Sequence, residues 1–203
     1  MSLRLDPFAF PDPMLDNTPG TGTATAVLGG GCFWCTEAVY LQLGGVLKVR
    51  PGYAGGEPGT ASYRAICSGT TGHAEVIEIT YERLQISFGQ LLKMFFSIAH
   101  DPTQLNRQGH DVGTQYRSAV FYQTEEEKKV TAAYIKQLEE AGAYHGRIVT
   151  TLEPLATFYV AEDYHHNYAA LNPDQGYIRT VALPKAEKAR KANAAHWPIN
   201  HRR

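Results

Sequence analysis

The stretch GGGCFWC at residues 29–35 joins a predicted strand, residues 24–28, to a predicted helix that follows the glycines. This places Cys32 at the N-terminus of a helix, where unpaired backbone N–H groups and the helix dipole favour a thiolate. The thiolate is the reactive form of cysteine, so the position of Cys32 indicates chemistry. The aromatic residues Phe33 and Trp34 would surround this thiol with apolar groups, which suits a small, non-ionic part of a substrate.

Outside this stretch, strand and helix patterns alternate along the chain. Residues 73–81 alternate with a period of two, which places Glu75 on the same apolar face as Ile77 and Ile79. Residues 88–99 have the apolar spacing of an amphipathic helix, opened by a Ser87 cap. Further strands are predicted at residues 46–50, 116–122 and 147–152, and further helices at residues 124–141 and 162–171. Strands and helices interspersed without regular βαβ spacing predict an α+β fold, an α/β two-layer sandwich with a ferredoxin-like core and a mixed β-sheet.

The rest of the chain is predicted to be irregular. We expect an irregular N-terminal extension at residues 1–22, a single catalytic domain at 23–183 and a C-terminal tail at 184–203. Long stretches without a clear helix or strand pattern cover residues 51–72, 101–113 and 173–203. Such loops in a compact domain are often functional.

The composition excludes several classes of protein. The 203 residues carry 19 basic and 20 acidic side chains, so no large basic surface for nucleic acid is expected. No apolar run approaches the roughly 20 residues that a membrane helix needs. Three cysteines are too few for a disulfide scaffold. The N-terminus lacks the apolar region of a signal peptide, so we expect a cytoplasmic protein. We also expect the protein to be a monomer.

The C-x-x-C pair of Cys32 and Cys35 allows several interpretations. The pair could exchange disulfides as in thioredoxin, or Cys32 could be a nucleophile whose oxidised product is resolved by Cys35. A zinc site with Cys67 and His73 is disfavoured, because no second pair stands at finger or ribbon spacing, and we expect no metal. A purely structural pair of buried cysteines is the common alternative. The thioredoxin interpretation is weakened by the strand order around the pair.

Glu75 is a candidate general acid. Burial at one end of an apolar strand face would disfavour its ionised form and raise its pKa, and a neutral carboxylic acid can donate a proton. The alternative is a glutamate in water at the end of a strand.

Other polar candidates are weaker when each is taken alone. Tyr63 and Tyr116 lie beside loops or strand ends, in a chain where most of the 12 tyrosines serve packing. Asp111 could be an ordinary turn aspartate. His165 and Tyr168 would share one face of a helix, where a histidine is usually a surface residue.

Seven motifs in order resemble the methionine sulfoxide reductase A family, over about residues 26 to 173. They are GGCFW (30–34), GYAGG (52–56), YR (63–64), CSGxxGHAE (67–75), HDP (100–102), GTQYRS (113–118) and EDxHxxY (162–168). Each motif is weak alone, but seven in sequence are specific. The resemblance implies a sandwich on a mixed sheet and reduction of the S-epimer of methionine sulfoxide, free or in proteins.

The resemblance also implies roles for the matched residues. Cys32 would attack the sulfoxide sulfur, and Phe33 and Trp34 would form the pocket for the substrate methyl group. The sulfoxide oxygen would be held and protonated by Glu75, Tyr63 and Tyr116, supported by Asp111 and His165. This agrees with the residue chemistry, because sulfoxide oxygen leaves poorly until it is protonated. A proton shared by Glu75 and Cys32 would make them a coupled titration.

The chain departs from much of this family in the cysteines that recycle the enzyme. Many members carry recycling cysteines in the C-terminal segment, and this chain has none after Cys67. Many also have glycine where this chain has Cys35. We expect a Cys32 sulfenic acid to be resolved by Cys35, one helical turn away, and the disulfide to be reduced by thioredoxin or another dithiol, without a bound cofactor. Cys67, or direct reduction of Cys32 by an external thiol, are the alternatives.

Two other functions predict different behaviour. A disulfide oxidoreductase would exchange thiols with protein substrates and would not turn over sulfoxide. A binding module for oxidised methionine would keep the aromatic pocket but form no product. The set of Glu75, Tyr63 and Tyr116 argues against a binding module, since binding alone needs no proton donor.

Overall fold

The computed structural model describes residues 3–196, and side chains up to residue 194. The main strands are β1 (Thr23–Gly30), β2 (Val46–Ala54), β3 (Ala74–Glu82), β6 (Ser118–Tyr122), β7 (Thr151–Pro154) and β8 (Phe158–Val160), and β4 (Arg107–Gln108) pairs with β5 (Asp111–Val112). The α-helices are α1 (Phe33–Tyr40), α2 (Tyr63–Ile66), α3 (Phe88–Met94), α4 (Glu125–Glu140), α5 (Tyr168–Leu171) and α6 (Leu183–His196). Short 3₁₀ helices are η1 (Pro7–Ala9), η3 (Thr114–Tyr116) and η4 (Asp163–His165), and π-helical turns are η2 (Phe95–Ala99) and η5 (Ile178–Ala182).

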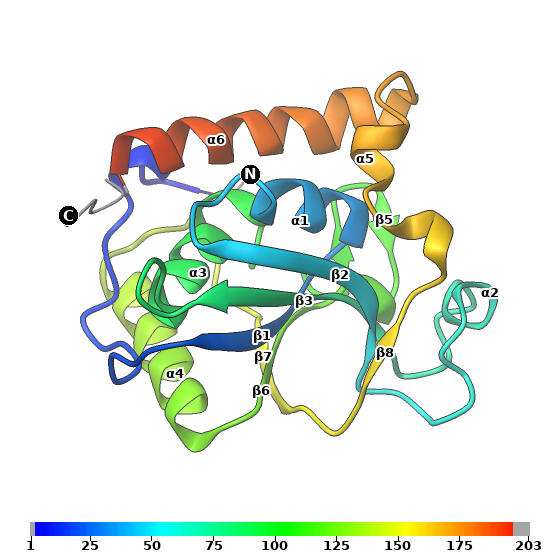
Figure 1. Cartoon of the computed structure of the whole chain (residues 1–203), viewed down its shortest axis with the longest axis horizontal. Helices are drawn as coiled ribbons and strands as arrows, with labels where there is room; N and C mark the ends of the chain where they lie inside the picture. Colours follow the sequence, from blue (N-terminus) through cyan, green and yellow to red (C-terminus); the bar gives the residue numbers. More distant parts are fainter. Residues whose placement is uncertain (1–2, 197–203) are drawn as a thin grey trace.

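One six-stranded sheet organises the chain, in the order β7-β6-β1-β3-β2-β8. All neighbouring pairs are antiparallel except β6 and β7, which are parallel, so the sheet is mixed. Helix α1 packs on β2 and β3, and α6 runs over α1 on its outer side (Figure 1). The predicted α+β sandwich with a mixed sheet is confirmed.

The two faces of the sheet differ in how they are covered. The face that carries Ile77, Ile79 and Tyr81 joins the large core formed with the helices. The opposite face has a smaller cluster of Val27, Val76 and Phe121, covered by Leu155 and Phe158 from the β7–β8 segment. Alternation along β3 therefore decides which side chains face the helices, and Glu75 belongs to the helical side, as its spacing predicts.

The segment over residues 88–99 is helical, but it is not amphipathic. Ser87 and Gln90 form a complete capping box at the start of α3, so the predicted Ser87 cap is confirmed. Every residue from Phe88 to Ala99 except Gln90 is buried, so the amphipathic prediction is wrong. The reason is the N-terminal segment, which covers the remaining side: Asp16 accepts from Gly89 N at 2.8 Å, and Asp12 pairs with Lys93 Nζ at 2.8 Å.

Several predicted bounds of strands and helices are wrong. The strand predicted at residues 147–152 is β7, which begins only at Thr151 and runs to Pro154. Strand β2 continues through Pro51 to Ala54, where an irregular stretch is predicted, because the Pro51 carbonyl still accepts a hydrogen bond from Ala161 N at 2.9 Å. The helix predicted at residues 162–171 is two short pieces, η4 and α5. They are separated by Asn167, whose φ of 53° interrupts the helix, so His165 and Tyr168 do not share one helical face.

The C-terminal stretch is more regular than predicted. Residues 178–196 form η5 and α6, so an irregular segment is the wrong prediction there. The buried side of α6 consists of Ala186, Ala189 and Ala192. Alanine has a high helix propensity but gives a weak hydrophobic pattern, which explains why the sequence pattern misses this helix.

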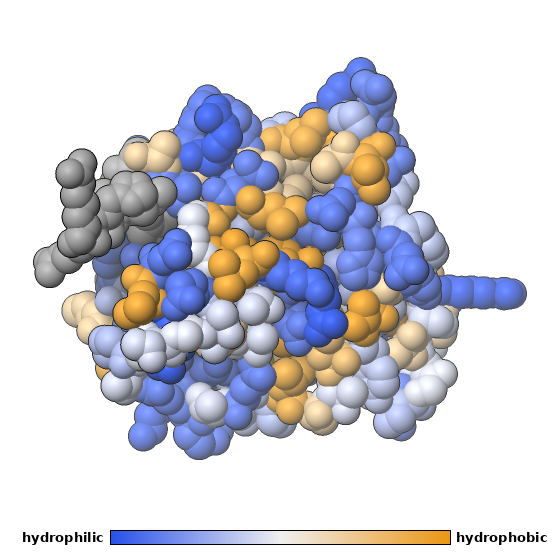
Figure 2. All heavy atoms as spheres, viewed as in Figure 1, coloured by the Kyte–Doolittle hydropathy of each residue, from blue (hydrophilic) through white to orange (hydrophobic). Residues whose placement is uncertain are grey.

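Within residues 3–196, no helix is both long enough and apolar enough to cross a bilayer. On the face shown in Figure 2, hydrophilic residues surround separate groups of hydrophobic ones.

The turn between β1 and α1 requires glycine. Gly31 has a φ of +85°, and a Cβ atom at this position would lie 2.6 Å from the Gln108 Cβ. A side chain here would therefore meet both left-handed backbone strain and a clash with a neighbouring loop.

We predict that Gly31→Ala lowers the free energy of unfolding by more than the roughly 1–2 kcal/mol of left-handed strain alone. Gly59→Ala is the matched control, because Gly59 also has a φ of +85° but has nothing within 4 Å of an added Cβ. Urea unfolding of both variants measures the difference. Equal losses would show that the contact with Gln108 carries no cost.

Candidate active site

The start of α1 brings Cys32 and Glu75 together. Strand β1 ends at Gly30, Gly31 turns the chain, and Cys32 is the N-cap of α1, as predicted. Neighbouring β3 places Glu75 beneath this helix start, and the Phe33 N–H donates to Glu75 Oε2 at 3.1 Å. The thiol and the carboxyl thus lie on the same side of the sheet.

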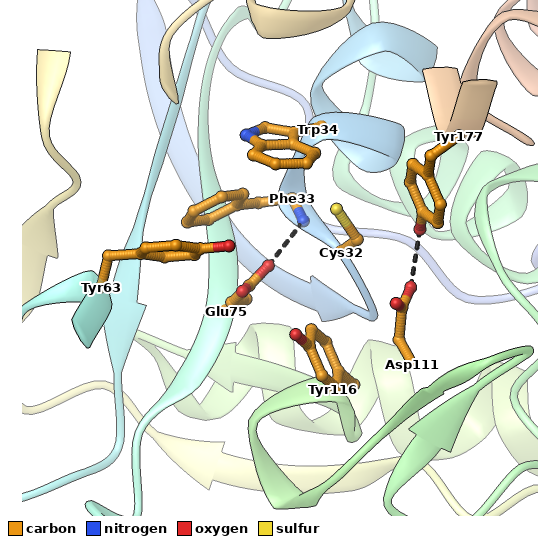
Figure 3. A pocket seen from close by; sticks show the side chains of 8 residues that line it. All are labelled: Cys32, Phe33, Trp34, Tyr63, Glu75, Asp111, Tyr116 and Tyr177. Atoms are coloured by element: carbon orange, nitrogen blue, oxygen red, sulfur yellow. Dashed lines mark hydrogen bonds between the residues drawn. The ribbon is translucent and has the colours of Figure 1, made fainter. Parts of the chain in front are cut away.

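A cavity of about 100 Å³ lies at this helix start (Figure 3). Seven of the nine predicted site residues line it, and an eighth residue, Tyr177, completes it; the lining residues are Cys32, Phe33, Trp34, Tyr63, Glu75, Asp111, Tyr116 and Tyr177. Cys35 and His165 do not line this cavity. The cavity is small enough to fit a single side-chain group, and both aromatic and acidic residues form its wall.

Glu75 is buried, with 2% of its surface exposed. Burial raises its pKa to about 8, and the hydrogen bond from Phe33 N opposes this shift only in part. The carboxyl is therefore mostly protonated at neutral pH and can donate a proton into the cavity. The alternative of a glutamate in water is wrong.

Tyr63 and Tyr116 complete the polar side of the cavity, and Figure 3 shows their hydroxyl groups pointing toward the Glu75 carboxyl. Tyr63 begins α2 and Tyr116 ends η3. Burial is the main cause that raises the pKa of both hydroxyls, and nearby acidic groups raise it further. Both residues therefore remain neutral hydrogen-bond donors, directed at the place where Glu75 would release a proton.

A ring of aromatic side chains forms the apolar side. Trp34 stacks on Tyr168, with ring centroids 3.9 Å apart and an interplanar angle of 8°. The Trp34 Nε1–H donates to His165 Nδ1 at 3.0 Å, and the His165 ring lies 4.9 Å from that of Phe33. These contacts fix the orientation of the indole and of the phenyl ring that face the cavity.

His165 supports the site from behind the cavity. Its side chain is fully buried, and burial lowers its pKa, so the ring is neutral and its Nδ1 can accept from Trp34. Glu162 lies next to it and accepts from the Tyr53 hydroxyl and from Tyr63 N, both at 2.8 Å. Glu162 thus ties together the two segments that carry Tyr63 and His165. Tyr53 and Glu162 occur in the quoted motifs, but their spacing alone gives no sign of this contact.

Cys35 follows one turn after Cys32, and both thiols are buried. The interaction with the Cys35 thiol is the largest cause that raises the pKa of Cys32, and burial and Glu75 raise it further. The same interaction lowers the pKa of Cys35 to about 7. The prediction that the helix start favours a Cys32 thiolate is therefore wrong for the free protein, because these three effects outweigh the one N–H, from Trp34, that favours it.

Tyr177 is the cavity residue that the sequence pattern misses. It lies just before η5, in a stretch predicted to be irregular, and one tyrosine among 12 gives no signal of its own. Its hydroxyl donates to Asp111 Oδ2 at 2.6 Å and accepts from the Cys35 thiol at 3.5 Å. This chain of contacts connects the thiol pair to Asp111.

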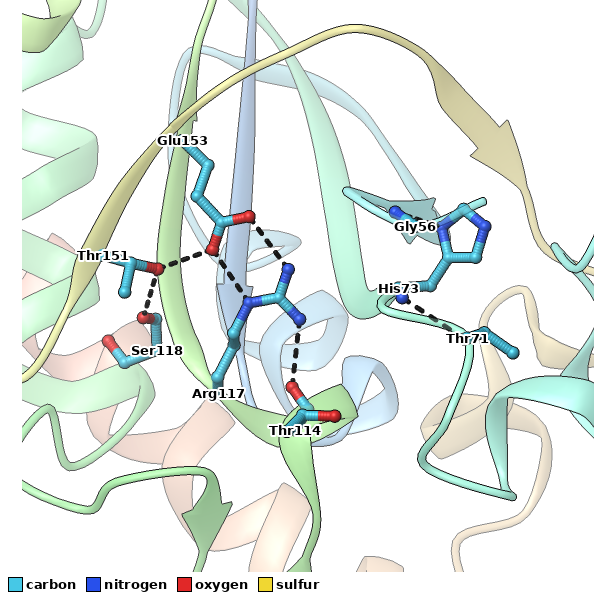
Figure 4. A network of polar contacts seen from close by, with 8 residues as sticks. All are labelled: Gly56, Thr71, His73, Thr114, Arg117, Ser118, Thr151 and Glu153. Atoms are coloured by element: carbon cyan, nitrogen blue, oxygen red, sulfur yellow. Dashed lines mark hydrogen bonds and ion pairs between the residues drawn. The ribbon is translucent and has the colours of Figure 1, made fainter. Parts of the chain in front are cut away.

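The loops that carry these residues are held by a polar network around Arg117 (Figure 4). The Arg117 guanidinium donates to both oxygens of Glu153, at 2.8 and 2.9 Å, and also to the Thr114 carbonyl at 3.1 Å. These bonds link η3, which carries Tyr116, to strand β7. On the neighbouring loop, His73 Nδ1 accepts from Gly56 N at 3.1 Å, so His73 is a structural residue rather than a metal ligand in this structure.

Comparison with known proteins agrees with this geometry. The sequence model of the family described as peptide methionine sulfoxide reductase matches residues 24–197. The peptide methionine sulfoxide reductase MsrA of Natronomonas pharaonis is 52% identical over 172 residues, which cover 85% of this chain and 96% of that protein. The crystal structure of reduced Mxr1 from Saccharomyces cerevisiae is similar, with a TM-score of 0.70 and 34% identity over 83% of this chain and 95% of that one. Methionine sulfoxide reductase A of Corynebacterium diphtheriae has a TM-score of 0.66 and 37% identity over 80% and 82% of the two chains.

We predict that Glu75→Gln stabilises the fold in a pH-dependent way. The Glu75 carboxyl has a pKa of about 8 in the folded protein and 4.5 when exposed in the unfolded chain. Its contribution to the free energy of unfolding is therefore complete below pH 4.5 and is lost as the pH rises toward 8. The wild type therefore loses stability relative to the variant as the pH rises from 4.5 to 8, and the difference then levels off. Chemical unfolding at a series of pH values measures it.

Glu57→Gln is the control, because the Glu57 side chain is exposed to water. Its stability relative to wild type should stay constant over the same range. A constant difference for Glu75→Gln as well would contradict the buried, neutral carboxyl.

Proposed function

The chain belongs to the peptide methionine sulfoxide reductase family, and on that premise we propose that Cys32 and Glu75 act together to reduce the S-epimer of methionine sulfoxide. The substrates are the free amino acid and oxidised methionine residues in proteins. One observation carries the assignment of roles: the Cys32 thiol and the neutral Glu75 carboxyl line the same small cavity, whose other side is aromatic.

The cavity suits the shape and polarity of the sulfoxide group. Phe33 and Trp34 offer an apolar surface for the S-methyl group. Glu75, Tyr63 and Tyr116 offer hydroxyl donors for the oxygen. A sulfoxide bound in this orientation presents its sulfur to Cys32.

In the first step, the sulfoxide sulfur of the substrate is reduced and the Cys32 sulfur is oxidised. Cys35, which its lower pKa makes the thiolate of the pair, accepts the proton of Cys32. The Cys32 thiolate attacks the sulfoxide sulfur while Glu75 protonates the oxygen. The hydroxyl group then passes to the Cys32 sulfur: the bond between the two sulfurs and the S–O bond of the intermediate break, an S–O bond to Cys32 forms, and methionine leaves with the electron pair while Cys32 becomes a sulfenic acid. Tyr63 and Tyr116 stabilise the charge on the oxygen during the transfer.

In the second step, Cys35 resolves the sulfenic acid. Its thiol now carries the proton taken from Cys32 and lies one helical turn from that residue. The Cys35 sulfur attacks the Cys32 sulfur, a disulfide forms and water leaves. Cys67 is a poorer candidate, because it is exposed at the end of α2, whereas Cys32 and Cys35 are buried one helical turn apart.

The third step returns the enzyme to its reduced form. Thioredoxin or another dithiol supplies two electrons and two protons, and no bound cofactor is needed. Among the described residues, no group of His, Cys, Asp and Glu side chains is arranged to hold a metal ion. The monomeric state and the cytoplasmic location stay predictions.

We predict that Glu75→Gln lowers the rate of methionine formation by about 10²–10³-fold, because the amide cannot supply the proton. The wild-type rate should fall as the pH rises through about 8, where Glu75 loses its proton. Single-turnover measurements at a series of pH values test both effects.

Glu78→Gln is the matched control for this test. Glu78 lies three residues further along β3 and binds Arg50 instead of facing the cavity. Its variant should keep the wild-type rate. A Glu75→Gln enzyme with full activity would remove Glu75 from the role of proton donor.

We predict that Cys35→Ser releases one methionine per enzyme, more slowly than wild type because the acceptor of the Cys32 proton is lost, and then stops with a sulfenic acid on Cys32. Wild type and Cys67→Ser should instead form an intramolecular disulfide and continue to turn over with thioredoxin. Mass spectrometry after reaction with methionine sulfoxide, with a trap for sulfenic acid, distinguishes these products. A disulfide in the Cys35→Ser protein would assign resolution to Cys67.

A further inference from the structure

A second cavity, of about 320 Å³, reaches the thiol pair from the other side. Both cysteines line it, together with Tyr177, Thr180, Val181 and Lys185 from the C-terminal segment. Residues of the 101–111 loop form the facing wall. Cys35, which is absent from the wall of the substrate cavity, is therefore reachable here.

Tyr177 and Asp111 separate the two cavities. Both residues line the substrate cavity as well as the second one, and the hydrogen bond of 2.6 Å between them closes the wall. Cys32 is also shared by both cavities. The Cys32 sulfur thus borders both spaces, whereas Cys35 lines only the second one.

The charges around the second cavity favour a thiolate. Lys185 Nζ donates to the Ala99 carbonyl at 2.9 Å, and its positive charge lowers the pKa of Cys35. The two carboxylates in the wall are held by other groups: Asp101 accepts from Thr103 and Gln104, and Asp111 accepts from Tyr177. Lys185 is thus placed to stabilise a negatively charged sulfur at Cys35.

The two cavities differ in volume, and each volume suits a different molecule: the smaller a sulfoxide group, the larger a small reductant. About 100 Å³ suits a sulfoxide group, whereas about 320 Å³ lies at the lower end of pockets that hold small molecules. A reductant with two thiols on a short carbon chain fits the larger space. Its wall is largely apolar, with the thiol pair at its end.

We propose that the second cavity binds an aliphatic dithiol, either free or carried by a protein, which reduces the Cys32–Cys35 disulfide. This inference rests on the proposed function, since it requires that disulfide. The substrate can therefore leave through its own cavity while the reductant enters through the other one.

The exchange runs in two steps. One thiolate of the dithiol attacks the Cys35 sulfur; the Cys32–Cys35 bond breaks, and its electron pair goes to Cys32, which takes a proton. The second thiolate of the dithiol then attacks its own sulfur in the mixed disulfide. Cys35 leaves with the electron pair as a thiolate next to Lys185, and the dithiol departs as a cyclic disulfide. The enzyme gains two electrons, and the dithiol loses two.

Two variants test this route on enzyme whose Cys32–Cys35 disulfide has been formed beforehand with methionine sulfoxide. Thr180→Trp fills the cavity from an exposed position on η5, and its control is Arg179→Trp, an exposed neighbour outside the cavity wall. Lys185→Met removes the charge, and its control is Lys188→Met, on the exposed side of α6. The rate of disulfide reduction is measured with dithiothreitol and, separately, with thioredoxin.

We expect both cavity variants to react about tenfold more slowly than their controls. For Lys185→Met this is the effect of shifting the pKa of one thiol by about one unit. For Thr180→Trp the new side chain hinders the approach of the dithiol to a similar extent. Slower reaction with dithiothreitol alone assigns the cavity to free dithiols, and slower reaction with both reductants assigns it also to a protein dithiol. Rates equal to the controls with both reductants would overturn the inference. A wild type that forms no Cys32–Cys35 disulfide before any reductant is added would instead overturn the proposed function.

Discussion

One hydrogen bond, from the Phe33 N–H to the Glu75 carboxyl, connects the strand that supplies the acid to the helix that supplies the thiol. It joins β3 to the start of α1 inside the core, where an unpaired carboxyl oxygen would be costly. The same bond uses an N–H group that would otherwise be free to stabilise an anion at Cys32. Acid and nucleophile are thus set in place by a contact that also limits how readily the nucleophile ionises.

This competition explains why helix position alone predicts the chemistry of Cys32 incorrectly. A cysteine at a helix start usually has a lowered pKa, because backbone N–H groups point at its sulfur. Here Glu75 occupies the first of these groups, burial removes water, and Cys35 takes the role of the more acidic thiol. The reactive thiolate at Cys32 therefore arises by proton transfer within the pair.

Local patterns were sufficient for five of the six strands of the sheet, though not for all of their bounds, and for most of the cavity. A period of two along β3 predicts the burial of Glu75, and the glycines before Cys32 predict the turn into α1. The roles of Tyr177 and of Glu162 could not be predicted in this way, because Tyr177 contacts Cys35, and Glu162 contacts Tyr53 and Tyr63, across segments far apart in the chain. Helix α6 was missed for a different reason: its alanines pack closely but carry little hydrophobic signal.

The packing of this C-terminal segment also bears on where the resolving thiol must be. Ala186 and Ala189 are buried in α6, which lies along α1, and Ile178 is fully buried in η5. A thiol delivered from this segment would have to break that packing in every cycle. Resolution by Cys35, as proposed, would avoid the rearrangement, because a single turn of helix separates it from Cys32. The ordered segment is then free to form one wall of both cavities, which a segment that moved in each turnover could not do.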